Sequence, residues 1–320
     1  MIEILCTVGP NSINKNFLTN LKGTRVTTLR INLSHTKINE IKKVYNKIRR
    51  YSNLPICLDT EGAQIRTSFK GRKFLKLKQI VKIKKKNKLK SFNLYPEIFD
   101  KLKKNQILEI GFENLIIKIS TIKKNYCVAK VISQGFLENN KGVHIQNQKI
   151  HLSPLTKKDL ESIKISKKIG IEKYALSFTN NVNDVKYFNS ILPKYKKIFK
   201  IETRSAITNF NSIIKSCNTV LIDRGDLSKD IGLLDVPVVQ RKIQKIAKKN
   251  KKKVFVATNL LESMIEKPYP TRAEINDIYN CLELGANGLV LAAETAIGKW
   301  PLECVKLLDS IIDKYEKKNN

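Results

Sequence analysis

Residues that could do chemistry follow several short apolar segments of this 320-residue sequence, at the positions where strands would end. They are Arg30, Asn32, Ser34 and His35, then Asp59 and Thr60, Lys200 and Glu202, Arg224, Gly225 and Asp226, and finally Glu294 and Thr295. A lone Lys or Asp at a strand end more often belongs to a structural ion pair than to a catalytic site. When several strands end in such groups, however, their side chains converge on one pocket. The sequence therefore predicts one pocket that holds charges of both signs.

The charged groups of this pocket suit phosphoryl transfer assisted by a divalent metal. Arg30 and Lys200 could neutralise an oxygen-rich transition state. Glu202, two residues after Lys200 and so on the same side of a strand, and Asp226 offer the hard oxygen ligands that Mg²⁺ prefers. Gly225 and Asp226 also offer backbone N–H groups at a predicted helix start, where a substrate carboxylate can bind. Because burying such charges without a ligand is costly, we favour a functional role over a structural one for Lys200 and both carboxylates.

The apolar segments that precede these residues have the composition of β-strands and alternate with segments of helical periodicity. The expected strands cover residues 3–8, 26–33, 55–59, 173–178, 197–202, 219–223, 253–258 and 288–293. The expected helices cover residues 13–22, 37–51, 157–169, 236–250, 271–285 and 301–317. Parallel strands joined by crossover helices produce this alternation. Eight such units predict an α/β fold, a closed (β/α)8 TIM barrel.

The alternation is interrupted between residue 67 and about residue 142. Segments such as QILEI, LIIKIST and YCVAKVIS have the two-residue period of strands instead. We therefore expect a small β-barrel-like domain over residues 68–142, inserted after the third strand, and a catalytic barrel made of residues 1–67 and 143–320. An insertion at that point is a candidate lid over the pocket.

The net charge of +33 raises the question of a nucleic-acid partner. Lysines spread along the whole chain supply most of this charge, and the densest basic run, residues 82–90, contains no aromatic side chain that could stack on bases. We favour a solvated surface over a nucleic-acid interface.

Neither an exported nor a membrane protein is expected. The N-terminal segment has no basic leader followed by an apolar stretch, and no segment offers about 18 uncharged apolar residues in a row. The six cysteines lack the paired spacing of a zinc or redox site. Reduced thiols and a cytoplasmic location are therefore expected.

The motifs of the sequence also resemble those of a known family. In order along nearly the whole chain, CTVGPNS, LRINLSH, LDTEGAQIRT, KGV, KIE, DRGDL, VATNLLESMIEKPYPTRAEIND and ETAIGKWPLE resemble pyruvate kinase motifs. The longest of them is highly specific. The resemblance implies a barrel with an inserted β-domain that transfers the phosphoryl group of phosphoenolpyruvate to ADP, giving pyruvate and ATP as the last step of glycolysis.

The resemblance also implies roles for individual residues. Lys200 would be the catalytic lysine, Arg30 would assist it at the phosphoryl group, and Thr295 would lie near the site of enolpyruvate protonation. The remaining assignments are Glu202 and Asp226 as ligands of Mg²⁺ or Mn²⁺; Asn32, Ser34, Asp59 and Thr60 as ligands of K⁺; Arg30, Lys200, Gly225, Asp226 and Thr295 as substrate contacts; and Asn32, His35, Arg66 and Lys141 as nucleotide contacts.

Several positions depart from the family pattern. Gln64 stands where relatives have an acidic residue or, in potassium-independent members, a lysine, so the requirement for K⁺ is open. Glu61 replaces a lysine, and Asp223 replaces a small residue before Arg224, where an extra carboxylate could disturb the metal site. The chain ends where most members continue into a C-terminal regulatory domain. We expect that domain to be absent and assembly, if it occurs, to be a homo-oligomer through barrel surfaces.

Two other functions remain open from the sequence. One is a different phosphoenolpyruvate or pyruvate enzyme on the same barrel, against which the KIE, RGDL and ETA motifs and the insertion argue. The other is a catalytically weakened relic that serves as a basic binding scaffold.

Overall fold

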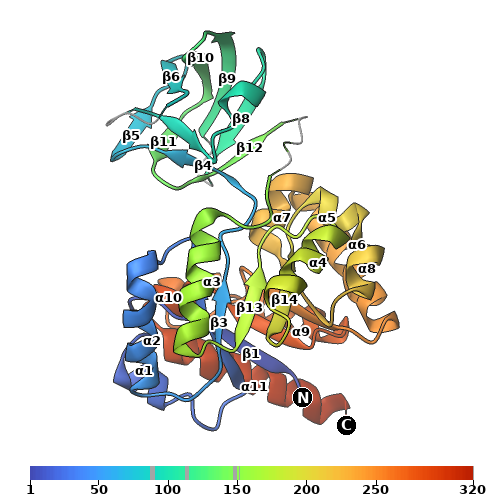
Figure 1. Ribbon diagram of the computed structural model, residues 1–320. Helices are drawn as coiled ribbons and strands as arrows, with labels where there is room; N and C mark the ends of the chain where they lie inside the picture. The colour runs from blue at the N-terminus through green and yellow to red at the C-terminus, as the bar shows by residue number, and fades with distance from the viewer. Residues whose placement is uncertain (87–90, 112–114, 147–149, 151, 320) are drawn as a thin grey trace. The chain divides into compact units, whose positions relative to one another are not determined.

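The computed structural model describes residues 1–86, 91–111, 115–146, 150 and 152–319 (Figure 1). Residues 87–90 of the basic run therefore lie outside the described residues. The chain divides into two compact units, one made of Met1–Ala63 and Pro154–Asn320, the other of Gln64–Ser153. The expected insertion, residues 68–142, falls inside the second unit.

The first unit contains a closed barrel of parallel strands in the order β1-β17-β16-β15-β14-β13-β3-β2. The strands are β1 (Glu3–Thr7), β2 (Val26–Asn32), β3 (Ile56–Asp59), β13 (Lys173–Leu176), β14 (Lys196–Ile201), β15 (Thr219–Asp223), β16 (Lys253–Ala257) and β17 (Gly288–Leu291). Each expected strand agrees with an observed one to within about two residues at either end. The prediction of a (β/α)8 barrel is confirmed.

Helices follow the strands around the barrel (Figure 1). They are α1 (Lys15–Thr19), α2 (Ile41–Arg49), α3 (Lys157–Ile169), α4 (Val182–Ile191), α5 (Arg204–Thr208), α6 (Phe210–Lys215), α7 (Arg224–Ile231), α8 (Val236–Lys249), α9 (Arg272–Glu283), α10 (Ala293–Ala296) and α11 (Pro301–Asn319), with short 3₁₀ turns η1 (Ile38–Glu40), η3 (Leu233–Asp235) and η4 (Glu262–Ile265). No helix in the described part of the chain is both long and apolar enough to cross a membrane.

Hydrogen bonds between neighbouring residues fix where several helices begin. At the start of α3, the Thr156 hydroxyl accepts the N–H of Asp159 (3.0 Å), and the Asp159 carboxylate accepts the N–H of Thr156 (2.9 Å). Asn181 with Asp184 and Thr271 with Glu274 form the same reciprocal cap at α4 and α9. Such caps satisfy backbone donors that have no partner inside a helix.

The interior of the barrel is closed by a layer of apolar side chains: Leu5, Cys57, Ala175, Ile198, Leu221, Phe255, Ala257 and Val290. On a strand the residue two positions later points to the same side. Four polar residues each follow a member of this layer by two positions: Asp59, Ser177, Lys200 and Asp223. These polar side chains therefore point into the mouth of the barrel, directly above an apolar floor.

The second unit is built from strands with a separate apolar core. A seven-stranded sheet has the order β6-β10-β9-β8-β12-β4-β7, and a two-stranded sheet pairs β11 with β5. The strands are β4 (Ile65–Ser68), β5 (Arg72–Leu75), β6 (Ile80–Lys84), β7 (Asn93–Tyr95), β8 (Ile107–Ile110), β9 (Leu115–Ile122), β10 (Tyr126–Ser133), β11 (Gly135–Glu138) and β12 (Gly142–Ile145), with one 3₁₀ turn, η2 (Phe99–Lys101). The prediction of an additional β-domain is confirmed.

Candidate active site

Lys200 lies at the centre of a buried charge cluster at the mouth of the barrel. Its Nζ atom is 2.7 Å from Glu202 Oε1, 3.1 Å from Asp223 Oδ2 and 3.5 Å from Asp59 Oδ2. The lysine is only 5% exposed. Burial alone would lower the pKa of Lys200, but the three carboxylates outweigh it and raise this pKa well above its usual value. The ammonium group therefore stays charged inside the barrel.

Arg30 supplies the second buried cation of the cluster. Its Nε donates to the Thr7 hydroxyl (2.8 Å), and its Nη1 donates to Asp59 Oδ2 (3.0 Å). The other oxygen of Asp59 accepts a hydrogen bond from the Ser177 hydroxyl (3.2 Å), which also lies 3.3 Å from Lys200 Nζ. Asp59 thus lies between two positive groups and holds both in place.

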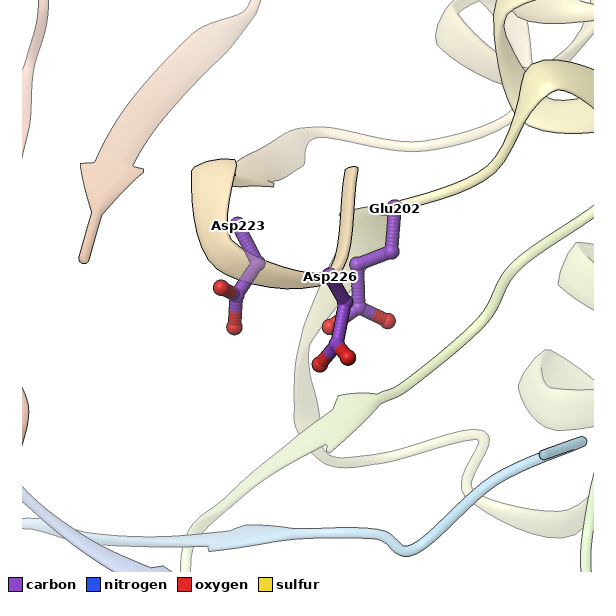
Figure 2. A group of neighbouring side chains, drawn as sticks. All are labelled: Glu202, Asp223 and Asp226. Atoms are coloured by element: carbon purple, nitrogen blue, oxygen red, sulfur yellow. The ribbon is translucent and has the colours of Figure 1, made fainter. Parts of the chain in front are cut away.

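Three carboxylates near Lys200 are spaced so that they could hold a metal ion. Figure 2 shows their side chains. Glu202 follows β14, Asp223 ends β15, and Asp226 lies in the first turn of α7. One oxygen from each carboxylate lies within 4.8 Å of the others. Glu202 and Asp226 were predicted as ligands from the sequence, whereas Asp223 was expected only to disturb the metal site.

The environment of Glu202 fits a cation. Its Oε2 accepts the N–H of Phe178 (2.5 Å), whereas its buried Oε1 accepts no hydrogen bond of good geometry from the described residues and has only the Lys200 ion pair. Burial raises the pKa of Glu202 to about 8; Lys200 opposes this shift, and Asp223 and Asp226 add to it. A buried carboxylate that is difficult to ionise and has an oxygen without a hydrogen bond is suited to a hard divalent cation.

Asp223 differs from Glu202 in its electrostatic environment. Its Oδ1 accepts the hydroxyl of Thr258 (2.6 Å), and its Oδ2 faces Lys200. Burial alone would raise the pKa of Asp223, but Lys200, the Thr258 hydroxyl and Arg30 lower it well below its usual range. Asp223 is therefore an anion in the structure.

Thr258, which follows β16, is a residue that sequence reasoning missed. Its φ angle is +78°, a rare conformation for a β-branched residue, and Asn259 follows at +56°. Such backbone costs about 1–3 kcal/mol and persists only when its surroundings enforce it. Here the Thr258 carbonyl accepts the Nε of Arg224 (3.0 Å), while a Cβ added at Gly225 would come within 3.0 Å of the Thr258 methyl group.

The predicted potassium ligands lie at the ends of two neighbouring strands. Asn32 of β2 pairs in register with Asp59 of β3. The side-chain oxygen of Asn32 accepts the N–H of Ser34 (2.9 Å), and the hydroxyl of Thr60 accepts the N–H of Ser177 (3.0 Å). These loops are thus ordered by local hydrogen bonds.

Lys158, on α3, connects the two loops that carry these predicted ligands. Its Nζ atom donates to the carbonyl of Leu33 (2.5 Å) and pairs with Glu61 Oε1 at 2.8 Å. Glu61, which replaces the family's lysine, is thus neutralised by a lysine from another element. This pairing was not predicted from the sequence.

Thr295 and Glu294 lie on α10 and are fully buried. The Thr295 hydroxyl donates to the carbonyl of Thr7 (2.8 Å), and the Glu294 carboxylate accepts the N–H groups of Leu261 (3.3 Å) and Ala292 (2.7 Å). Glu294 therefore holds the loop geometry, and Thr295 is attached to β1 beside the Thr7 hydroxyl that Arg30 contacts.

The predicted nucleotide contacts are distributed over both units. Asn32 and the exposed His35 belong to the first unit, and Arg66 and Lys141 to the second. Arg66 donates to the carbonyl of Asn140 (3.2 Å), and Lys141 pairs with Glu138 at 2.7 Å. Nucleotide binding by these four residues stays a prediction.

Fold and site together define a class of protein: a (β/α)8 barrel enzyme with a buried lysine and carboxylates at the carboxyl ends of its strands. A family model described as pyruvate kinase, barrel domain, matches residues 1–305. A pyruvate kinase of Thermotoga maritima is 33% identical, with 99% of this chain and 71% of the relative covered. Those of Agrobacterium vitis (32% identical; 98% and 68% covered) and Methanocaldococcus jannaschii (31% identical; 97% and 68% covered) are similar.

The chain belongs to the pyruvate kinase family. It is a phosphotransferase, and the resemblance seen in its motifs is confirmed. The comparisons give no support to the alternative of a basic binding scaffold.

Proposed function

We propose that the buried cluster around Lys200 is where the phosphoryl group of phosphoenolpyruvate passes to ADP. The observation that carries this proposal is that a lysine only 5% exposed is held as a cation among Asp59, Glu202 and Asp223. An ammonium group fixed in a low-dielectric site interacts with a developing negative charge much more strongly than it would in water.

Lys200 and Arg30 neutralise the phosphoryl group as it leaves the enol oxygen. Both are already oriented, Lys200 by its carboxylates and Arg30 by Thr7 and Asp59. Positioning and charge neutralisation account for most of the catalysis in phosphoryl transfer. Because the two cations share Asp59, a phosphoryl group bound between them would take over part of the role of that carboxylate.

Glu202 and Asp226 hold the divalent cation, Mg²⁺ or Mn²⁺. When bound, the cation supplies charge neutralisation at the phosphoryl oxygens. The N–H groups of Gly225 and Asp226 open the first turn of α7 and bind the carboxylate of the substrate. Thr295 completes the substrate site near the enolpyruvate carbon, with its Oγ1 oriented by the bond to the Thr7 carbonyl.

The remaining roles follow from the resemblance. K⁺ is held by Asn32, Ser34, Asp59 and Thr60. The nucleotide is contacted by Asn32, His35, Arg66 and Lys141. The neutral side chain of Gln64 supplies no substitute charge, so we expect K⁺ to stimulate the reaction. The proposal locates the reaction in the cytoplasm, consistent with six cysteines that are all buried free thiols.

The experiment is an assay of pyruvate formed from phosphoenolpyruvate and ADP with Mg²⁺, in the presence and absence of K⁺, for the native protein and Lys200→Met. We expect the variant to lose at least about 10²–10³-fold in kcat, the usual cost of removing one preorganised charge donor. Lys173→Met is the matched control, because Lys173 is a half-buried lysine at the start of β13, at the opposite end of the barrel. Full activity in Lys200→Met would refute the proposal.

A further inference from the structure

Asp223 is a charged group at the mouth of the barrel to which the proposed function gives no role. It follows Leu221 of the apolar floor by two residues, so its side chain points into the mouth. It is only 9% exposed, and the family pattern has a small residue at this position. Burying an additional carboxylate is costly unless a positive group compensates for its charge.

Each positive group of the cluster already pairs with one or more carboxylates. Arg30 pairs with Asp59, and Lys200 lies within 3.5 Å of three carboxylates. Glu202 Oε1 is buried, and apart from its ion pair with Lys200 it has no hydrogen bond of good geometry among the described residues. With Glu202 ionised, the four carboxylates of Asp59, Glu202, Asp223 and Asp226 outnumber the three cations of Arg30, Lys200 and Lys229, as expected of a site that receives a further cation.

The oxygens of Asp223, Glu202 and Asp226 are suitably spaced for that cation. Oxygen ligands on opposite sides of Mg²⁺ are about 4 Å apart, because each metal–oxygen distance is roughly 2.1 Å. The three oxygens lie within 4.8 Å of one another, so small side-chain adjustments would bring them to ligand distances. Figure 2 shows the three side chains gathered around the first turn of α7.

We propose that Asp223 is a third carboxylate of the divalent-cation site, paired with Lys200 until the cation displaces the ammonium group. This inference rests on the proposed function, because it assumes that Glu202 and Asp226 hold the cation. The Thr258 hydroxyl fixes Oδ1, which leaves Oδ2 for either Lys200 or the cation. With a cation bound there, Lys200 would lose its pairing with Asp223 and could face the phosphoryl group.

The experiment is a Mn²⁺ titration without substrates, in which free Mn²⁺ is measured by its electron paramagnetic resonance signal. Asp223→Asn keeps an acceptor for Thr258 but removes the charge, and it should weaken Mn²⁺ binding at least about tenfold, since ligand charge sets cation affinity. Asp235→Asn is the matched control: Asp235 is exposed on η3, and this variant should bind Mn²⁺ like the native protein. Lys200→Met should bind Mn²⁺ more tightly than the native protein, because the competing ammonium is gone.

The outcomes separate this inference from the proposed function. Unchanged or tighter Mn²⁺ binding by Asp223→Asn, with binding lost in Glu202→Gln, would overturn the inference and leave Asp223 as a counter-ion of Lys200 alone. Absence of Mn²⁺ binding by the native protein, or full binding by Glu202→Gln, would overturn the proposed metal site as well. If Asp223→Asn does not fold, Thr258→Val provides the test: weaker Mn²⁺ binding supports the inference, and native affinity contradicts it.

Discussion

Asp159 should be one of the most sensitive residues of the barrel to substitution. It is fully buried, and its two oxygens accept the N–H groups of Glu61 (2.8 Å), Gly62 (3.1 Å) and Thr156 (2.9 Å) and the hydroxyl of Thr156 (2.9 Å). Asp159→Ala would strand two N–H groups of the loop after β3, each at about 1–3 kcal/mol. With about 0.5–2 kcal/mol for the lost cap of α3 included, we expect the free energy of unfolding to fall by about 3–8 kcal/mol.

The assay is urea unfolding followed by circular dichroism, with the slope of the transition compared between variants. Asp184→Ala is the matched control, because Asp184 belongs to the same kind of cap on α4 but, among the described residues, accepts only the neighbouring N–H groups of Asn180 and Asn181. We expect it to cost about 1–2 kcal/mol. Equal losses in the two variants would refute the reasoning, because the loop bonds would then contribute nothing.

Two further predictions concern the charge cluster and its loops. In metal-free protein, Glu202→Gln should be more stable than the native protein at pH 8, and this advantage should shrink toward pH 5. The reason is that the pKa of Glu202 is raised in the folded state, so the native protein loses stability as pH rises from about 4.5 to about 8. Thermal melts across that range in EDTA test it, and a pH-independent difference would contradict it. Lys158→Met should reduce the rise in melting temperature that K⁺ produces, because Lys158 links the loops of Leu33 and Glu61. Lys157→Met, on the same helix, is the control. An unchanged K⁺ response in Lys158→Met would contradict this role.

The barrel could be predicted from the sequence because its strands are short apolar segments that recur between helical ones. The two-residue period also placed Lys200 and Glu202 on one side of β14, and the structure brings them together. Helices α4, α5, α6 and α10 were not predicted, and of α7 only the start was. Several of these helices have fewer than nine residues and depend on packing rather than on a clear period.

Parts of the site could not be predicted, for physical reasons. Ser177 and Thr258 act through hydrogen bonds with residues distant in sequence, and the φ of +78° at Thr258 goes against the preference of its own side chain. Asp223 stood out only as a departure from the family pattern. Its pairing with Lys200 required knowledge of which strands are neighbours.

The pairing of β1 with β17 has a consequence for synthesis of the protein. Glu3 is in register with Gly288, so the barrel cannot close until the chain as far as β17 has left the ribosome. At about 5–20 residues per second, β1 waits roughly 15–60 s for its partner. During that time an apolar strand has an open edge, which is a template for pairing with other chains. We therefore expect the nascent chain to depend on chaperones more than the finished barrel does.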